Sequence, residues 1–188
     1  MKIPYINNTH RHFFDLLWGM TEKELKARYK HMVFGFLWVI VNPLLQMLVI
    51  GFVFRLFIKE PIPNYYFYLF SGLLVWNFFT LSLTKVTPSI VYERALIKKA
   101  KFPHSVIPLS IILSNEIIML IAFILLSLPV VVSRSSTIPR LPYFLFALVL
   151  LTSFTTGLSL LTSALNVRFR DVNFFVQALL IVWFYATP

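Results

Sequence analysis

The sequence predicts an all-α protein, a polytopic transmembrane helical bundle with an amphipathic helix at the membrane interface before it. Three observations lead to this fold class. Hydrophobic residues make up 59% of the chain and charged residues only 13%, whereas soluble domains are about half apolar and about a quarter charged. Long apolar segments alternate with short charged or proline-containing breaks. Lys and Arg gather in every second break, as in a chain that crosses a membrane repeatedly.

The first expected element is an interfacial amphipathic helix over residues 10–33. Thr21 and Glu24 have the spacing of a capping box, in which each side chain bonds the other residue's backbone amide, and this pattern predicts a helix start. Apolar residues then recur at helical spacing and form one stripe: Leu25, Tyr29, Met32, Val33 and Phe36. Basic residues occupy the other faces: Lys23, Lys26, Arg28 and Lys30. Such a helix lies in the membrane interface.

Two pairs of opposite charges support the same helix. Glu22 precedes Lys26 by four residues, and Glu24 precedes Arg28 by four, which is the favourable order for ion pairs along a helix. The alternative is that this segment is only the charged flank of a transmembrane span. That alternative explains the charge but neither the capping pattern nor the apolar stripe.

Five transmembrane spans are expected, over residues 34–58, 65–83, 106–132, 141–167 and 172–188, all within a single domain covering residues 1–188. A helix needs about 20 apolar residues to cross the hydrocarbon core. In the first span, Pro43 follows Asn42 and predicts a kink, because proline lacks the amide donor and clashes with the preceding turn. The last span would extend only about 25 Å, short of the ~30 Å core. A further span is therefore expected after Pro188.

The distribution of basic residues predicts the orientation. Of the 17 Lys and Arg residues, thirteen fall in breaks on the side of the N-terminus and four in the opposite breaks. Loops that stay in the cytoplasm carry the excess of Lys and Arg. The N-terminus and the break between the second and third spans are therefore expected on the cytoplasmic side of the plasma membrane. The same rule explains the net charge of +10 without nucleic-acid binding.

The basic segment over residues 89–103 lies between the second and third expected spans. Its charges are explained by topology; they include Glu93, Arg94, Lys98 and Lys99. Its apolar pair, Leu96 and Ile97, is not explained, since the segment is expected to face water. We therefore predict a short helix near residues 91–99 whose apolar pair docks on another protein.

Polar residues inside the expected spans form a second group of candidates: Asn42, Gln46, Asn115, Glu116 and Asn166. An ionisable group within the membrane is a candidate for a proton or substrate relay. The alternative for Glu116 is a polar contact to a neighbouring helix. We favour the contact, because no second acid or base is expected at similar depth. The amide side chains are interpreted in the same way.

The sequence lacks the motifs of the enzyme classes considered. It has no phosphate-binding G-x-x-x-x-G-K-[ST] loop, no G-x-S-x-G and no H-E-x-x-H. It has no Cys, and its four His residues do not show metal-ligand spacing with acids. We predict no catalytic residue, metal site or cofactor in this chain. Aromatic residues form 17% of the chain, which fits an interfacial belt and equally a conduit for sugars.

Several blocks along the chain together resemble the type-2 ABC exporter permeases, the ABC-2 type family. The most similar branch comprises membrane subunits that export lipid-linked polysaccharide, O antigen, capsule or teichoic acid. The blocks follow one another in family order: residues 24–30, 34–38, 42–45, 69–79, 96–99, 102–103, 107–110, 163–172 and 183–188. They cover nearly the whole chain, which makes the resemblance more specific than any single motif.

The resemblance implies a permease in the bacterial inner membrane that moves a lipid-linked glycan. It implies a second copy of the permease and separate cytoplasmic ATPase subunits, which would hold ATP and Mg²⁺. Six residues would form the loop that couples to the ATPase: Glu93, Arg94, Leu96, Ile97, Lys98 and Lys99. Four residues of the interfacial helix would gate access: Leu25, Arg28, Tyr29 and Lys30. Membrane lipids are the remaining partner.

Other functions stay open from the sequence. An ATP-independent flippase or channel would favour ionisable groups near the membrane midplane, where only Glu116 qualifies. A membrane enzyme acting on lipid-linked sugars would need acids, His or Arg clustered near one interface, and no such cluster is visible. A drug or a lipid is the alternative cargo, because the preference for polysaccharide follows from the resemblance alone.

Overall fold

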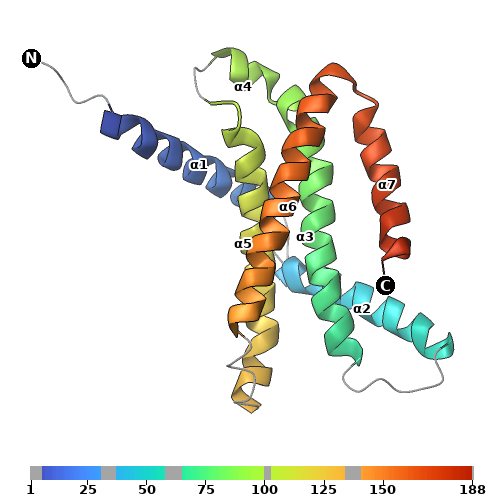
Figure 1. The fold of residues 1–188 in the computed structure, drawn as a ribbon. Coiled ribbons are helices and arrows are strands. Elements are labelled where there is room, and N and C mark those ends of the chain that lie inside the picture. The colour runs from blue at the N-terminus through green and yellow to red at the C-terminus, as the bar shows by residue number, and fades with distance from the viewer. Residues whose placement is uncertain (1–5, 31–36, 58–64, 100–102, 134–140, 188) are drawn as a thin grey trace, which may run out of the picture.

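The computed structural model describes residues 6–30, 37–57, 65–99, 103–133 and 141–187. These ranges contain seven helices and no strand (Figure 1): α1 (Ile6–Tyr29), α2 (Trp38–Phe57), α3 (Tyr65–Tyr92), α4 (Arg94–Lys99), α5 (Val106–Ser133), α6 (Leu141–Arg168) and α7 (Val172–Ala186). The predicted all-α class is therefore confirmed. The break between the first and second expected spans, residues 59–64, lies outside the described residues. So does the break between the third and fourth, residues 133–140, except for Ser133.

Helix α3 is the centre of the bundle. It packs against α2, α5, α6 and α7, and Figure 1 shows α3, α5 and α6 running alongside one another. Within the described residues, three helical segments are long and apolar enough to cross a membrane: Tyr68–Tyr92, Val106–Leu125 and Pro142–Arg168. The apolar segments of α2 and α7, Ile40–Val53 and Val172–Ala186, are shorter. Helix α3 continues well beyond residue 83, where the second span was expected to end.

The apolar core lies where α3 meets α5. Its buried side chains are Phe78, Val86, Ile107, Ile111, Ile112 and Met119. Met20 of α1 and Ile97 of α4 pack against the same cluster. We call this group the central cluster. It ties α1 and the short helix α4 to the same part of the bundle.

Small polar residues allow α6 to approach α3 closely. One face of α6 carries the buried residues Thr155, Ser159, Thr162, Ser163 and Asn166, and their spacing of three or four residues places them on one side of the helix. The hydroxyl of Thr87 on α3 donates to the hydroxyl of Thr162 at 3.0 Å. In a membrane, where lipid is as apolar as leucine, such close packing and hydrogen bonding hold helices together.

Enlarging a residue on this α6 face is expected to destabilise the bundle. Ser159 is fully buried, so Ser159→Leu forces α6 away from α3 at a cost of about 1–3 kcal/mol. Gly157 is the matched control, because a Cβ built there meets nothing within 4 Å. Thermal unfolding in detergent should show a lower midpoint for Ser159→Leu and almost none of that loss for Gly157→Leu. Equal midpoints for the two variants would contradict this packing.

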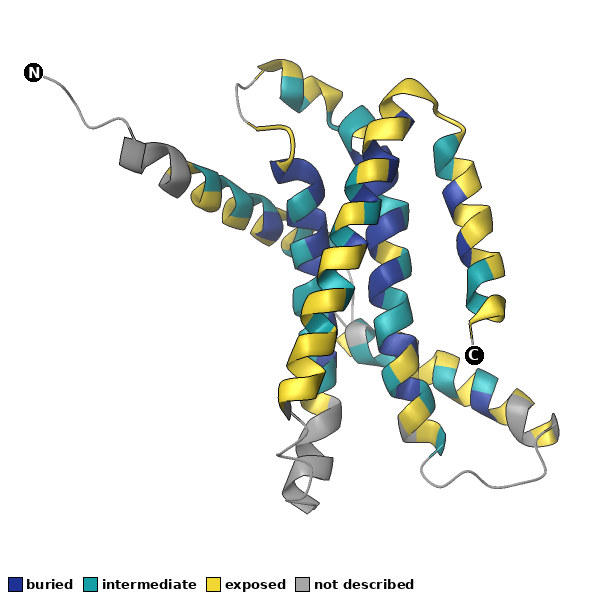
Figure 2. Cartoon of the chain, viewed as in Figure 1, coloured by how far each residue is buried: buried dark blue, intermediate teal, exposed yellow. Residues whose placement is uncertain are grey.

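The outer surfaces of α6 and α7 are apolar. Much of both helices is exposed (Figure 2). The exposed residues include large hydrophobic ones, among them Tyr143, Phe146, Val149, Phe174, Phe175 and Ile181. A soluble protein rarely exposes a continuous apolar surface of this extent. An exposed apolar surface of this extent agrees with the spanning lengths of α3, α5 and α6.

The predicted capping box at Thr21 is wrong. Helix α1 is continuous from Ile6 to Tyr29, and Thr21 is buried in its middle with its hydroxyl donating to the carbonyl of Leu17 at 2.7 Å. A threonine within a helix bonds the preceding turn in this way. The expected ion pair of Glu22 with Lys26 is confirmed.

A polar cavity between the surface helix and the membrane helices

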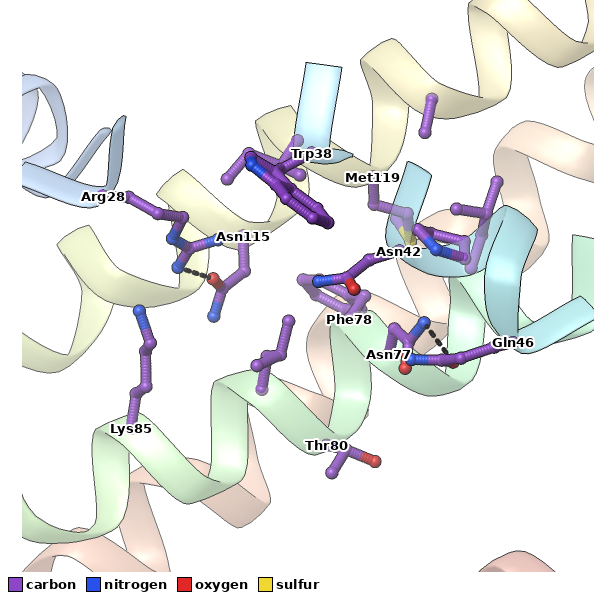
Figure 3. Close-up of a pocket in the computed structure, with 15 residues that line it drawn as sticks. Arg28, Trp38, Asn42, Gln46, Asn77, Phe78, Thr80, Lys85, Asn115 and Met119 are labelled. Atoms are coloured by element: carbon purple, nitrogen blue, oxygen red, sulfur yellow. Dashed lines mark hydrogen bonds between the residues drawn. The ribbon is translucent and has the colours of Figure 1, made fainter. Parts of the chain in front are cut away.

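A cavity of about 370 Å³ lies where α1, α2, α3 and α5 meet (Figure 3). Helix α1 contributes Arg28, α2 contributes Asn42 and Gln46, α3 contributes Asn77 and Lys85, and α5 contributes Asn115. The remaining lining is mainly apolar: Trp38, Pro43, Leu74, Phe78, Thr80, Leu81, Ile118, Met119 and Ala122. The cavity thus combines two cations, four amide side chains and two aromatic rings.

Arg28 is held at this cavity by a chain of hydrogen bonds. Its guanidinium Nη2 donates to Oδ1 of Asn115 (Figure 3). Nδ2 of Asn115 in turn donates to Oγ of Ser82 at 3.1 Å. Asn115 and Ser82 are buried. The chain joins α1 to α5 and α5 to α3. The sequence predicted an ion pair of Arg28 with Glu24 instead. In the structure Arg28 bonds Asn115 inside the bundle.

Lys85 brings a second cation to the same cavity. Asn77, Leu81 and Lys85 are spaced by four residues along α3, so they share one face of that helix. Figure 3 shows the Lys85 ammonium and the Arg28 guanidinium both directed toward Asn115. No carboxylate belongs to the described lining of this cavity. Glu24 and Glu93 line an adjacent cavity that Lys85 also borders. Two neighbouring cations with no acid in the described lining of their own cavity favour binding of an anion there.

The amide side chains of Asn77 and Gln46 lie at the end of the cavity away from Arg28 and Lys85 (Figure 3). Nδ2 of Asn77 donates to Oε1 of Gln46 at 3.1 Å, which joins α3 to α2. The hydroxyl of Thr80 is buried and has no hydrogen-bond partner within the described part of the chain. Amide and hydroxyl groups at this position can donate to, and accept from, a polar ligand such as a sugar.

A second cavity, of about 480 Å³, continues the polar face of α3 toward α7. It shares Gln46, Asn77 and Thr80 with the first cavity and adds Gln177 of α7. Aromatic side chains border it: Trp76, Phe184 and Tyr185. The ring centroids of Trp76 and Phe184 lie 5.4 Å apart. The polar face of α3 therefore runs between two cavities with aromatic edges.

Of the predicted intramembrane polar residues, three line the first cavity, together with the predicted kink residue Pro43: Asn42, Gln46 and Asn115. Glu116 and Asn166 lie elsewhere. Glu116 accepts a hydrogen bond from the hydroxyl of Thr152 at 2.8 Å, which connects α5 to α6. Asn166 is buried on the α6 face that packs against α3, and its Oδ1 has no partner among the described residues.

The predicted coupling residues lie at the end of α3 and in α4. Glu93 forms the turn between these helices, and its Oε1 pairs with Nζ of Lys23 at 3.3 Å. Ile97 packs against the central cluster. Leu96 is half-buried, whereas Arg94, Lys98 and Lys99 are exposed. In Figure 1, α4 and the turn from α6 to α7 lie at the same end of the bundle.

The predicted gating residues divide between described and undescribed parts. Arg28 lines the cavity, Leu25 is half-buried and Lys30 is exposed. The side chain of Tyr29 lies outside the described residues, as do Met32, Val33 and Phe36. Reasoning from the sequence missed Lys85 as a cavity residue. The signal that could have found it is the spacing of eight residues between Asn77 and Lys85, which places both side chains on one face of a helix.

The fold and cavity define a class of protein, a polytopic helical membrane protein with a polar cavity between its helices. Residues 15–188 match the family described as ABC-2 type transporter. The chain belongs to this family of transporter membrane domains.

Curated relatives agree with this assignment. An O-antigen export system permease protein RfbA of Klebsiella pneumoniae is 40% identical over 186 residues, covering 94% of this chain and 69% of the relative. The protein of that name from Myxococcus xanthus is 37% identical over 178 residues, covering 92% of this chain and 66% of the relative. The chain thus spans about two thirds of the length of these relatives.

Proposed function

We propose that this chain is the membrane-spanning permease subunit of an ATP-driven exporter that moves a lipid-linked polysaccharide out of the cytoplasm. A separate ATPase subunit would hydrolyse ATP, and a second copy of the permease would complete the conduit. Family membership supports the transport role, and the relatives' names give the glycan class. The cavity that holds Arg28 and Lys85 is the observation that carries the proposal.

The chemistry of the cavity suits the linkage between lipid and sugar. A lipid-linked glycan carries phosphate groups at that junction, and guanidinium and ammonium groups bind phosphate through charge-assisted hydrogen bonds. The amides of Asn42, Gln46 and Asn77 lie in the same cavity and suit sugar hydroxyls. The rings of Trp38 and Phe78 offer apolar surface beside them. A cavity of about 370 Å³ suits a headgroup rather than a whole polymer.

The charge distribution supports a cytoplasmic location for one end of the bundle. Helix α4 carries Arg94, Lys98 and Lys99. Helix α6 ends at Arg168, and the turn that follows carries Arg170. We call this the basic end. By the positive-inside rule the basic end faces the cytoplasm, where a soluble ATPase could dock on α4.

Removing the charge of Lys85 is expected to weaken binding of the lipid-linked substrate about tenfold. One hydrogen bond to a charged group contributes about 1.5–3 kcal/mol, and 1.4 kcal/mol corresponds to a factor of ten. The measurement is binding of a polyprenyl-diphosphate-linked oligosaccharide to the purified permease variants Lys85→Gln and Lys85→Arg. The arginine variant should retain most of the affinity.

Lys26→Gln is the matched control for this charge. Lys26 is a cation of α1 that pairs with Glu22 and does not line the cavity. Equal affinities for Lys85→Gln and Lys26→Gln would contradict substrate binding in this cavity. Export from proteoliposomes that lack any ATPase subunit would instead favour the ATP-independent flippase.

A further inference from the structure

We infer that the ion pair between Lys23 and Glu93 is a mechanical link that passes motion of α4 to α1, and through α1 to the cavity. The inference rests on the proposed function, in which an ATPase displaces α4. Lys23 and Glu93 are positioning residues in this scheme. Neither of them lines the cavity that holds Arg28 and Lys85, whereas Glu93 lines an adjacent cavity that Lys85 also borders.

The first part of the link is the position of Glu93 between two helices. Its backbone amide donates to the carbonyl of Ser89 in α3 at 2.9 Å. Its carbonyl accepts from the amides of Leu96 and Ile97, both at 3.0 Å. Glu93 therefore closes the last turn of α3 and opens the first turn of α4. Any rotation of α4 relative to α3 must pass through this residue.

The second part of the link is the contact from Glu93 to α1. Nζ of Lys23 lies 3.3 Å from Oε1 of Glu93, across 70 residues of sequence. Met20 of α1 and Ile97 of α4 also pack against the central cluster. Helices α1 and α4 thus both contact the central cluster. A shift of α4 would reach α1 through these two contacts.

The third part of the link is α1 itself. Arg28 follows Lys23 by five residues on the same uninterrupted helix, which is a separation of about 8 Å along the axis. A hydrogen-bonded helix transmits such a displacement as a rigid body. Movement at Glu93 therefore reaches the guanidinium of Arg28 and its bond to Asn115.

The exposure of the ion pair allows the link to be tested without unfolding the protein. The side chains of Lys23 and Glu93 are 56% and 36% exposed, and exposed ion pairs contribute little to stability. Reversing either charge should leave membrane insertion and thermal stability close to those of the unmodified permease. A change in transport would then reflect a change in how ATP hydrolysis is coupled to glycan export.

Charge reversal is the first experiment. The permease is reconstituted with its ATPase partner, and glycan exported per ATP hydrolysed is measured for Lys23→Glu, Glu93→Lys and the double variant. Each single reversal should lower this ratio about fivefold, and the double reversal should restore it. Reversing Glu22 and Lys26 is the matched control, because that pair lies entirely within α1. Single variants with an unchanged ratio, or a folded double variant without recovery, would overturn the link.

A crosslink tests whether residues 23 and 93 stay together while α4 and α1 move, or whether they must separate during transport. The chain has no Cys, so Lys23→Cys with Glu93→Cys gives two unique thiols for a short bis-methanethiosulfonate reagent. Crosslinked permease should keep its coupling ratio, and loss of transport that a reductant reverses would overturn the inference. An unmodified permease that neither exports glycan nor stimulates its ATPase would refute the proposed function. A failed charge rescue on an active permease would refute only the link.

Discussion

Asn115→Ala is expected to release Arg28 from the bundle and to reduce export to background. The variant removes the oxygen that accepts from Arg28 and the amide that donates to Ser82. A buried hydrogen bond to a charged group contributes about 1.5–3 kcal/mol, and its loss leaves a cation without its partner beside the cavity. Thermal unfolding in detergent and glycan export from proteoliposomes measure the two effects.

Two further substitutions separate loss of this contact from general damage. Asn115→Asp keeps an acceptor for Arg28 and adds the opposite charge, so it should recover much of the stability lost in Asn115→Ala. Asn173→Ala removes an amide whose side chain accepts a bond from Gln177 on the same helix, and it should be tolerated. Wild-type export by Asn115→Ala would show that the position of Arg28 does not govern the cavity.

Leu96→Asp is expected to uncouple the permease from its ATPase. Leu96 is a half-buried apolar residue on a short helix of the basic end whose neighbours Arg94 and Lys98 are exposed. A carboxylate introduced into an apolar docking contact typically costs at least about 2 kcal/mol, or roughly thirtyfold in affinity. Substrate-stimulated ATP hydrolysis and export should both fall, while insertion into the membrane is retained.

The choice of Leu96 over Ile97 comes from the structure. Both residues were predicted to contact the ATPase, and Ile97 packs against the central cluster of its own chain. Ile97→Asp should therefore also lower the thermal midpoint, which makes its effect on coupling harder to interpret. Ala95→Asp is the matched control, because Ala95 is exposed on the same helix. Unchanged export and unchanged ATPase stimulation in Leu96→Asp would remove α4 from the coupling scheme.

The local pattern of α1 shows why some predictions from the sequence failed. Thr21 and Glu24 fit a capping box, which would place the start of a helix at Thr21. The residues before Thr21 are also helical, so α1 runs through both positions. Thr21 is buried against the bundle. Its hydroxyl therefore bonds the carbonyl of Leu17 in the preceding turn of the same helix. A capping motif is a short-range signal, and tertiary packing overrides it here.

The cavity depends on contacts that no local pattern contains. Arg28 and Asn115 are 87 residues apart, and their meeting requires α1 to pack against α5. The sequence predicted that Asn115 contacts another helix, but it did not predict that the partner is Arg28 of α1. Lys85 was counted only as a charge flanking a span, whereas α3 continues to Tyr92 and places Lys85 on the same face as Asn77.

The sequence by itself determined that this protein is an all-α membrane bundle preceded by a basic helix. The physical reason is that apolar segments of spanning length must satisfy every backbone hydrogen bond internally, which a helix does. Only the tertiary structure decided which helix faces meet. It brought Arg28 and Lys85 together without a carboxylate in the described lining of the cavity, and it joined Lys23 to Glu93. These contacts form between faces of different helices, so spacing along one helix does not encode them.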